Sequence, residues 1–261
     1  MNNISKTLYI PLYGKAFVSK RGIILKDKKA EEIINNNQFK LKGKAKSKWL
    51  AFFMAMRSSV FDKWVKEQVE RYNDLTVLHL GCGLDSRVLR VNAVNTNWVD
   101  VDFEEVICER KRYYTETEFY RMISADISND SFVKFLPKSK TLIIVLEGVS
   151  MYLENDKLKD TLLILTKNYD SVAMLVDCYT PFAVKMSKLK NPIKSVGVNK
   201  VFGVSSPAVL EEGTNLTFVK EHQITPNDLI NELKGIERIM FKRVYAGRTS
   251  KKLYKLYEYK K

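Results

Sequence analysis

The stretch TVLHLGCGLDSR, residues 76–87, carries the pattern on which the fold prediction depends. A short apolar and β-branched run ends at the glycine pair Gly81 and Gly83, and a polar Asp-Ser-Arg sequence follows at 85–87. Glycine suits such a turn because a Cβ would restrict its dihedral angles and block a ligand's approach to the backbone. The pattern therefore predicts a strand, a glycine turn and a short helix, an arrangement that suits a nucleotide-like ligand.

The glycine pattern differs from the dinucleotide-binding fingerprint. That fingerprint requires a third glycine three positions after the second, so that the helix can pack closely against the strand. Ser86 stands at that position, which argues against NAD.

Three further strand-like runs end in an acidic residue. They cover residues 98–102, 122–127 and 141–148, and the acids are Asp102, Asp126 and Glu147. Asp102 follows Gly81 by about 20 residues, where a βαβ unit presents a carboxylate to ribose hydroxyls. Ligands of open α/β sheets bind at the carboxyl ends of the strands. The repeated acids therefore predict a nucleoside site at one edge of a parallel sheet.

Five segments together resemble the motifs of the leucine carboxyl methyltransferase family, which includes bacterial O-methyltransferases linked to polyketide synthesis. They occur in the family's order, and the resemblance covers roughly residues 10–180. The segments are AMRSSVFD (55–62), GCGLDSR (81–87), VDVDFEEVI (99–107), SADI (124–127) and EGVSMYL (147–153).

The resemblance implies an α/β fold of the class I methyltransferase type, which is Rossmann-like. Its seven-stranded sheet is mostly parallel, with an antiparallel seventh strand, a helical N-terminal extension and a lid insertion. At 261 residues the chain suits one domain. We expect a helical cap at 1–72, a cofactor-binding core at 73–179, a lid at 180–213, and C-terminal strands and a helix at 214–261.

Periodicity predicts most of the individual elements. Residues 1–45 hold short turns and one helix at 28–35, and residues 46–71 form a long amphipathic helix. Its expected apolar face contains Trp49, Phe53, Met56, Val60 and Trp64. Further helices are expected at 86–90, 103–117, 129–135, 155–169 and 226–246, the last interrupted at Gly235, and further strands at 171–178, 216–224 and 253–259.

The resemblance also implies S-adenosyl-L-methionine as cofactor, with S-adenosylhomocysteine as product. The cofactor-binding residues would be Arg57 for the cofactor carboxylate, Gly81 and Gly83 for the methionyl part, Asp102 for the ribose, Asp126 and Ile127 for the adenine, and Glu147 near the ammonium group.

Structural alternatives exist for several of these residues. Arg57, on the flank of the apolar face, could simply pair with a carboxylate. Asp102 could cap the following helix, and Asp126 could serve only in a turn. Glu147 ends an apolar strand, so it should face the ligand's ammonium group or pair with Arg57.

Other polar residues near these motifs are interpreted as structural or remain less certain. Asp100 is the less favoured ribose partner, and Asp62 points nearly opposite to the apolar face of its helix. Asp85 is expected to organise the glycine turn, and His79 and Cys82 to pack in the core. Lys15 lies where some family members carry a basic residue near the cofactor carboxylate.

Charge and cysteine content limit the partners and the compartment. The formal net charge is +14, and lysines cluster at 40–48, at 185–200 and at the C-terminus, which can mark a nucleic-acid partner. No nucleic-acid motif is present, and solvated lysine faces are the favoured explanation. No apolar run is long enough to span a bilayer, and the N-terminus lacks a secretory pattern. Three widely spaced cysteines and two histidines suggest no disulfide framework or metal site. We expect a cytoplasmic protein.

The expected reaction is O-methylation of a carboxylate or hydroxyl of a small, polyketide-like molecule. A protein C-terminal carboxylate is the alternative acceptor, and an RNA methyltransferase or nucleic-acid-binding protein is less favoured. A carboxylate acceptor needs no general base because it is ionised at pH 7. The sequence assigns no catalytic residue and no oligomeric state. Residues 11–50 and 180–213 are expected to select the acceptor.

Overall fold

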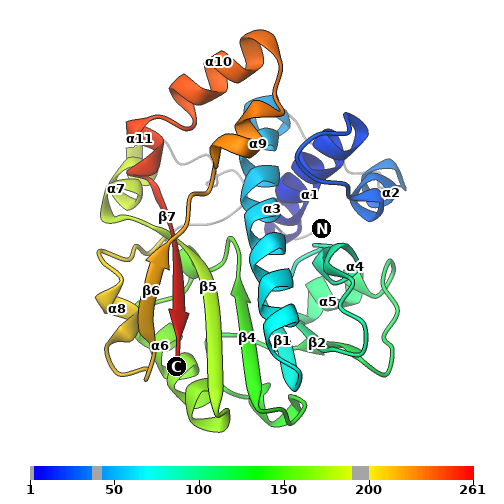
Figure 1. The fold of residues 1–261 in the computed structure, drawn as a ribbon, viewed down its shortest axis with the longest axis vertical. Helices are drawn as coiled ribbons and strands as arrows, with labels where there is room; N and C mark the ends of the chain where they lie inside the picture. The colour runs from blue at the N-terminus through cyan, green and yellow to red at the C-terminus, as the bar shows by residue number, and fades with distance from the viewer. Residues whose placement is uncertain (1–2, 37–42, 190–199) are drawn as a thin grey trace.

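A seven-stranded sheet in the order β3-β2-β1-β4-β5-β7-β6 lies at the centre of the protein (Figure 1). The computed structural model describes residues 3–36, 43–189 and 200–261. The strands are β1 (Leu75–Leu80), β2 (Asn97–Asp102), β3 (Tyr120–Ser124), β4 (Thr141–Leu146), β5 (Ser171–Tyr179), β6 (Thr217–Glu221) and β7 (Tyr254–Lys260).

Strands β1 to β5 pair in parallel, whereas β7 is antiparallel to both β5 and β6. This is the topology of a class I methyltransferase, so the predicted fold class is confirmed. The carboxyl ends of β1, β2, β4 and β5 consequently lie along one edge of the sheet.

Two apolar clusters cover the two faces of the sheet. On one face, Val77 and Val145 pack with residues of α1, α3 and α5, and on the other, Leu78 and Ile144 pack with α6. All residues of β1 and β4 are buried, as is typical of a parallel sheet covered on both faces. The longer helices are α1 (Asn3–Lys20), α2 (Lys28–Asn36), α3 (Lys48–Arg71), α5 (Glu104–Arg110), α6 (Asn155–Asn168), α7 (Pro181–Leu189) and α10 (Gly235–Val244).

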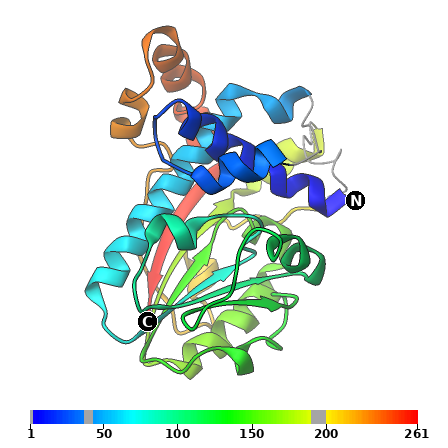
Figure 2. The same ribbon diagram turned by 90° about the vertical axis from the view of Figure 1, so that its right-hand side faces the viewer.

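Short helices connect the larger elements, and the N-terminal helices lie above the sheet (Figures 1 and 2). The short α-helices are α4 (Arg87–Val91), α8 (Ala208–Glu211), α9 (Asn227–Asn231) and α11 (Arg248–Lys251), and the 3₁₀ turns are Gly43–Lys46, Val133–Phe135 and Ser150–Tyr152. No helix within the described residues is long and apolar enough to cross a membrane.

The sequence prediction of short turns before residue 28 was wrong, because residues Asn3–Lys20 form helix α1. Pro11 and Gly14 are residue types typical of turns, but both lie inside α1. Gly14 instead allows close helix packing, because a Cβ there would lie 3.2 Å from the Cα of Ala51 in α3. Burial of Tyr9 and Leu12 then outweighs the local cost of Pro11.

Two other helices differ from their predicted form. The buried face of α3 is broader than expected and centres on Phe52, Met56 and Phe61, whereas Trp49 and Phe53 are only partly buried. Helix α5 ends at Arg110, although the prediction extended it to residue 117. The chain turns there because buried Tyr114 donates its hydroxyl to the carbonyl of Leu84 at 3.0 Å.

The predicted lid at 180–213 is described only in part. Helices α7 and α8 belong to it, and residues 190–199 lie outside the described part of the chain. The lid function remains a prediction.

Candidate active site

The glycine turn after β1 is held between β1 and β2. Gly81 and Gly83 have φ angles of +65° and +53°, which L side chains rarely adopt. A Cβ on Gly81 would lie 2.4 Å from Cγ2 of Val149. The backbone N–H of Gly83 donates to Oδ2 of Asp102 at 2.8 Å, and Arg110 donates to the Gly83 carbonyl at 3.0 Å. The turn is therefore fixed in place, with its two glycines required by its geometry.

Asp102 lies beside this turn at the end of β2. Its Oδ1 accepts from the N–H of Phe103 at 2.8 Å, just before α5 begins. Burial raises the pKa of Asp102, although the hydrogen bonds from Gly83 and Phe103 oppose that shift. This bond goes to the N-cap residue itself, and α5 has no side-chain cap hydrogen bond, so Asp102 does not cap the helix as the structural alternative proposed. Asp102 instead ties the glycine turn to the end of β2 through its Oδ2.

Asp100, two residues before Asp102, is fully buried and hydrogen-bonded within the protein. It accepts hydrogen bonds from Arg110 at 2.5 Å, from the Tyr120 hydroxyl at 2.7 Å and from the Trp98 indole at 2.9 Å. Burial alone would raise the pKa of Asp100, but Arg110, together with the nearby His79 and the Tyr120 hydroxyl, lowers it to about 2. Asp100 therefore anchors Arg110, which in turn holds the glycine turn.

Arg57 projects from α3 to the carboxyl ends of β4 and β5. Its Nε donates to Oε1 of Glu147 at 3.0 Å, and its Nη1 donates to Oδ2 of Asp177 at 2.7 Å. A Cβ on Gly148 would lie 3.1 Å from the Nη2 of Arg57. Glu147 was expected either to face the ligand's ammonium group or to pair with Arg57, and the structure shows the pair with Arg57.

Asp177 is the site residue that the sequence interpretation missed. It is fully buried at the end of β5, and its Oδ1 accepts from the Gly148 N–H at 2.6 Å. Burial raises the pKa of Asp177, and Arg57 opposes the rise. A signal was available in the sequence, since Asp177 is a single acid near the end of an apolar strand, as Glu147 is directly after β4.

The pair extends into a larger buried network of charges. Arg87 contacts Glu147 and donates to Asp62 at 2.8 Å, and Arg90 also donates to Asp62, at 2.6 Å. Burial would raise the pKa of Glu147, but Arg87 and Arg57 lower it. Asp62 is therefore buried and paired. These pairs agree with the interpretation of Asp62 as a structural residue, and they show that α3 is also covered on the side opposite its predicted apolar face.

Lys15 and Asp85 connect α1 to the glycine turn. The Lys15 ammonium lies 3.0 Å from Oδ2 of Asp85, and both residues are buried. The N–H of Asp85 also donates to the carbonyl of Cys82. Cys82 and His79 are buried, as predicted.

Asp126 and Ile127 lie directly after β3, the strand next to β2 in the sheet. Asp126 is exposed, and its Oδ1 accepts from the Ser128 N–H at 2.8 Å, which closes the predicted turn. Ile127 is buried in the cluster that covers one sheet face. The N–H of Ala125 donates to the carbonyl of Asp102 at 2.9 Å, so this segment lies next to the end of β2.

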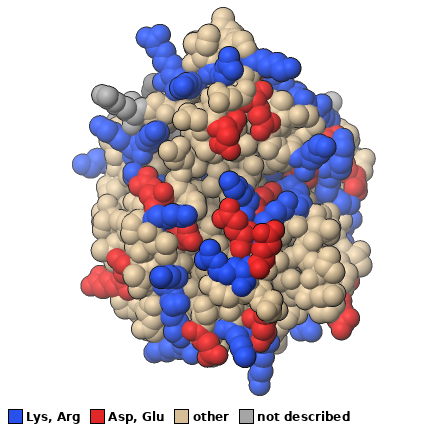
Figure 3. Space-filling model, in the orientation of Figure 1, with Lys and Arg blue, Asp and Glu red and all other residues tan. Residues whose placement is uncertain are grey.

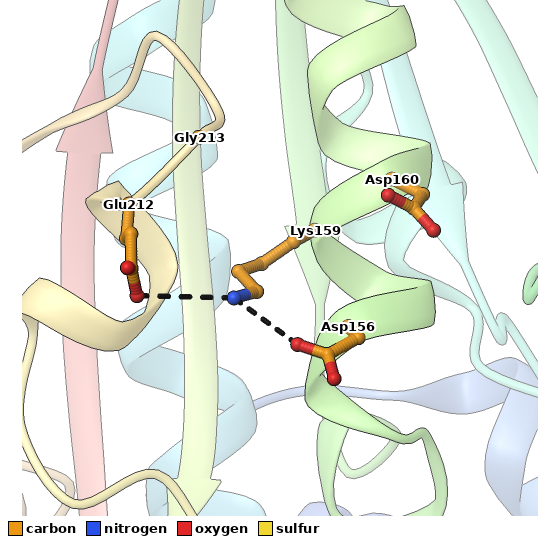
Figure 4. A pocket seen from close by; sticks show the side chains of 5 residues that line it. All are labelled: Asp156, Lys159, Asp160, Glu212 and Gly213. Atoms are coloured by element: carbon orange, nitrogen blue, oxygen red, sulfur yellow. Dashed lines mark ion pairs between the residues drawn. The ribbon is translucent and has the colours of Figure 1, made fainter.

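A separate surface hollow lies between α6 and the end of α8 (Figure 4). Lys159 lies between Asp156 at 3.1 Å and Glu212 at 3.9 Å, and Asp160 and Gly213 complete the lining. None of the strand-end residues lines this hollow. Its ion pairs are those of a solvated surface, and it is distinct from the candidate site.

No metal site is evident among residues 3–36, 43–189 and 200–261, where no three His, Cys, Asp or Glu side chains are grouped suitably. Cys82, Cys108 and Cys178 are free thiols.

Comparison with known proteins identifies the class. The fold resembles the crystal structure of magnesium protoporphyrin IX methyltransferase from Synechocystis with bound S-adenosylhomocysteine, with a TM-score of 0.55 and 12% identity over 90% of this chain and 93% of that one. Fold and relatives together define a class I S-adenosylmethionine-dependent methyltransferase. The leucine carboxyl methyltransferase model matches residues 4–166, and the chain belongs to that family.

Two characterised methyltransferases are similar to this chain in sequence. The tetracenomycin polyketide synthesis O-methyltransferase of Streptomyces glaucescens is 25% identical over 91% of this chain and 89% of its own length. An S-adenosyl-L-methionine-dependent methyltransferase of Gibberella zeae is 28% identical over 47% of this chain and 44% of its own. The first relative spans nearly the whole chain.

Proposed function

We propose that this methyltransferase transfers a methyl group from S-adenosylmethionine to an oxygen of a small molecule. The observation that carries the proposal is the glycine turn at Gly81 and Gly83, with positive φ at both residues, held against the Asp102 carboxylate at the carboxyl ends of β1 and β2. Similarity to the Streptomyces O-methyltransferase over nearly the full chain supports oxygen as the acceptor atom.

The residues around the turn suit the parts of the cofactor. Gly81 and Gly83 would leave the backbone accessible to the methionyl portion, and Asp102 would accept the ribose hydroxyls. The exposed Asp126 and the neighbouring Ile127 would border the adenine. S-adenosylmethionine supplies an already activated methyl group, so the protein's main tasks are to bind, orient and exclude water.

The guanidinium of Arg57 would bind the cofactor carboxylate. Glu147 and Asp177 occupy its Nε and Nη1, and no acceptor for Nη2 lies within the described residues. The two carboxylates would therefore fix the orientation of Arg57 while leaving one nitrogen available. Glu147 would also provide negative charge for the ammonium group.

The described chemistry favours a carboxylate as the acceptor. Both histidines of the chain have other partners, since His79 lies against Asp100 and His222 contacts Glu258 at 2.6 Å. Tyr179 and Tyr254 are hydrogen-bonded to each other at 3.0 Å, and burial raises the pKa of both. A hydroxyl acceptor would need a base near the pocket, whereas a carboxylate is already ionised.

Transfer of radiolabelled methyl groups into a metabolite extract tests the proposal. We expect label in a small organic product that releases methanol in mild base, as a methyl ester does and a phenol ether does not. A base-stable product would overturn the carboxylate acceptor, and mass spectrometry of that product would show whether the methyl group is on oxygen. Label in the protein or nucleic-acid fraction would instead indicate the C-terminal carboxyl or RNA alternative. We also propose a cytoplasmic location, in keeping with the three free thiols.

A further inference from the structure

Helix α10 exposes an aliphatic face at the upper end of the long axis of the molecule (Figure 1). Ile236 and Ile239 are 74% and 63% exposed, and Met240 and Val244 are also exposed. At about 100° per residue these four side chains fall on one side of the helix. An aliphatic helix face is normally buried against the rest of the protein, so the exposure of this one requires an explanation.

The opposite side of α10 attaches the helix to the protein. Phe241 is buried and contacts Phe52 edge to face, with ring centroids 6.0 Å apart. Tyr245, directly after the helix, stacks on Trp49 at 5.9 Å. The helix is therefore held by an aromatic inner face, and its aliphatic outer face is free to contact another surface.

Basic side chains lie within and beside the exposed face. At about 100° per residue, exposed Arg243 falls between Ile239 and Ile236, and exposed Lys242 lies at the edge of the face. Arg238 is also exposed but lies on the other side of α10. The only acid of the helix, Glu237, is paired with Arg21 at 2.7 Å and Lys48 at 3.1 Å. In Figure 3, Lys and Arg side chains border uncharged surface at this end of the molecule. The face combines aliphatic side chains with uncompensated positive charge.

We propose that α10 binds the surface of an anionic lipid bilayer, with its aliphatic side chains at the headgroup boundary. Interfacial helices combine apolar and basic residues in this way, and each basic residue near an anionic bilayer adds to the attraction. The proposal is independent of the methyl-transfer reaction and of its acceptor.

A second copy of the chain fits this face less well. Ten helical residues span only about 15 Å, too little for the roughly 800 Å² per partner of a stable protein interface. Two copies would also bring like charges together, since the chain carries a net charge of +14. A bilayer offers both the opposite charge and an apolar layer.

Co-sedimentation of the full-length chain with phospholipid vesicles tests this inference. We expect binding to vesicles of phosphatidylcholine and phosphatidylglycerol, and much weaker binding to phosphatidylcholine alone. The double variant Ile236→Asn/Ile239→Asn should reduce partitioning by about tenfold or more, because two aliphatic side chains no longer enter the boundary. Val94→Asn is the matched control, since Val94 is 74% exposed in a turn outside α10, and should bind as wild type does.

Charge is tested separately with Lys242→Gln/Arg243→Gln. Each neutralised residue should weaken binding by about fivefold, and added salt should weaken the wild type likewise. Lys63→Gln/Lys66→Gln, on exposed positions of α3, is the control and should have little effect. Circular dichroism would verify that all variants fold.

Three results would overturn the inference. The first is no binding of wild type to anionic vesicles at low salt, and the second is equal binding by the Ile236/Ile239 variant. The third is a dimer of the wild type, seen by light scattering, that the same variant abolishes, because the face would then be an interface between copies.

Discussion

Replacement of Arg57 by Ala should destabilise the protein strongly even without a ligand. The guanidinium lies 3.0 Å from Glu147 and 2.7 Å from Asp177, and all three side chains have at most 5% exposure. Removing one partner of a buried ion pair costs about 3–5 kcal/mol because it leaves a buried charge uncompensated. For a chain of this size that corresponds to a melting temperature lowered by roughly 6–20 °C.

The loss should depend on pH. Without Arg57, the two carboxylates can become neutral by taking up protons, so the destabilisation should shrink as pH falls from neutral toward about 5. A loss that came only from packing would not vary with pH.

Thermal unfolding of apo protein followed by circular dichroism at two pH values measures both effects. Lys111→Ala is the matched control, because its pair with Glu116 is half exposed and 3.6 Å long, and it should change stability by less than about 1 kcal/mol. If Arg57→Ala melts within about a degree of wild type, Arg57 is not engaged with Glu147 and Asp177, and the reasoning fails.

Three other substitutions test the glycine turn and its supports. Gly81→Ala should destabilise by about 1–3 kcal/mol through its positive φ and its 2.4 Å contact with Val149, whereas Gly213→Ala, at φ +78° with open space, should cost less in urea denaturation. Asp100→Asn should cost about 2 kcal/mol at neutral pH, from a pKa of about 2 against 3.8. Because that pKa is depressed by folding, the stabilisation is present above pH ~4 and lost as pH falls toward ~2, so the variant's acid-unfolding profile should be flatter. Asp102→Ala should weaken S-adenosylhomocysteine binding by about ten- to a hundredfold in calorimetry and lower apo stability by about 1–3 kcal/mol, since two backbone N–H groups lose their acceptor.

Much of the fold could be predicted because the sheet repeats simple local patterns. The mainly apolar strands β1, β4 and β5 are buried on both faces, and β1 ends directly before Gly81 and β4 directly before Glu147. Gly81 and Gly83 need their positive φ angles, so their spacing marked the turn. The order of the strands came from the family resemblance, because strand periodicity carries no information on which strands are neighbours.

The remaining features depend on contacts that a linear pattern does not contain. Helix α1 includes Pro11 and Gly14, and only its packing on α3 shows why a glycine belongs there. Asp62 of α3 pairs with Arg87 and Arg90, which both lie in α4, so its burial could not be derived from its angle on α3 alone. By contrast, the pairing of Arg57 with Glu147 was among the expectations because an unpaired charge at a buried strand end is costly.

Isothermal titration of the wild-type chain with S-adenosylhomocysteine tests the central claim most directly. With the Gly81–Gly83 turn and Asp102 as the binding site, we expect saturable one-to-one binding that Asp102→Ala weakens at least tenfold, and no heat with NADH. Absence of S-adenosylhomocysteine binding at high micromolar concentration, or saturable binding of NADH in its place, would contradict the assignment of this sheet edge to S-adenosylmethionine.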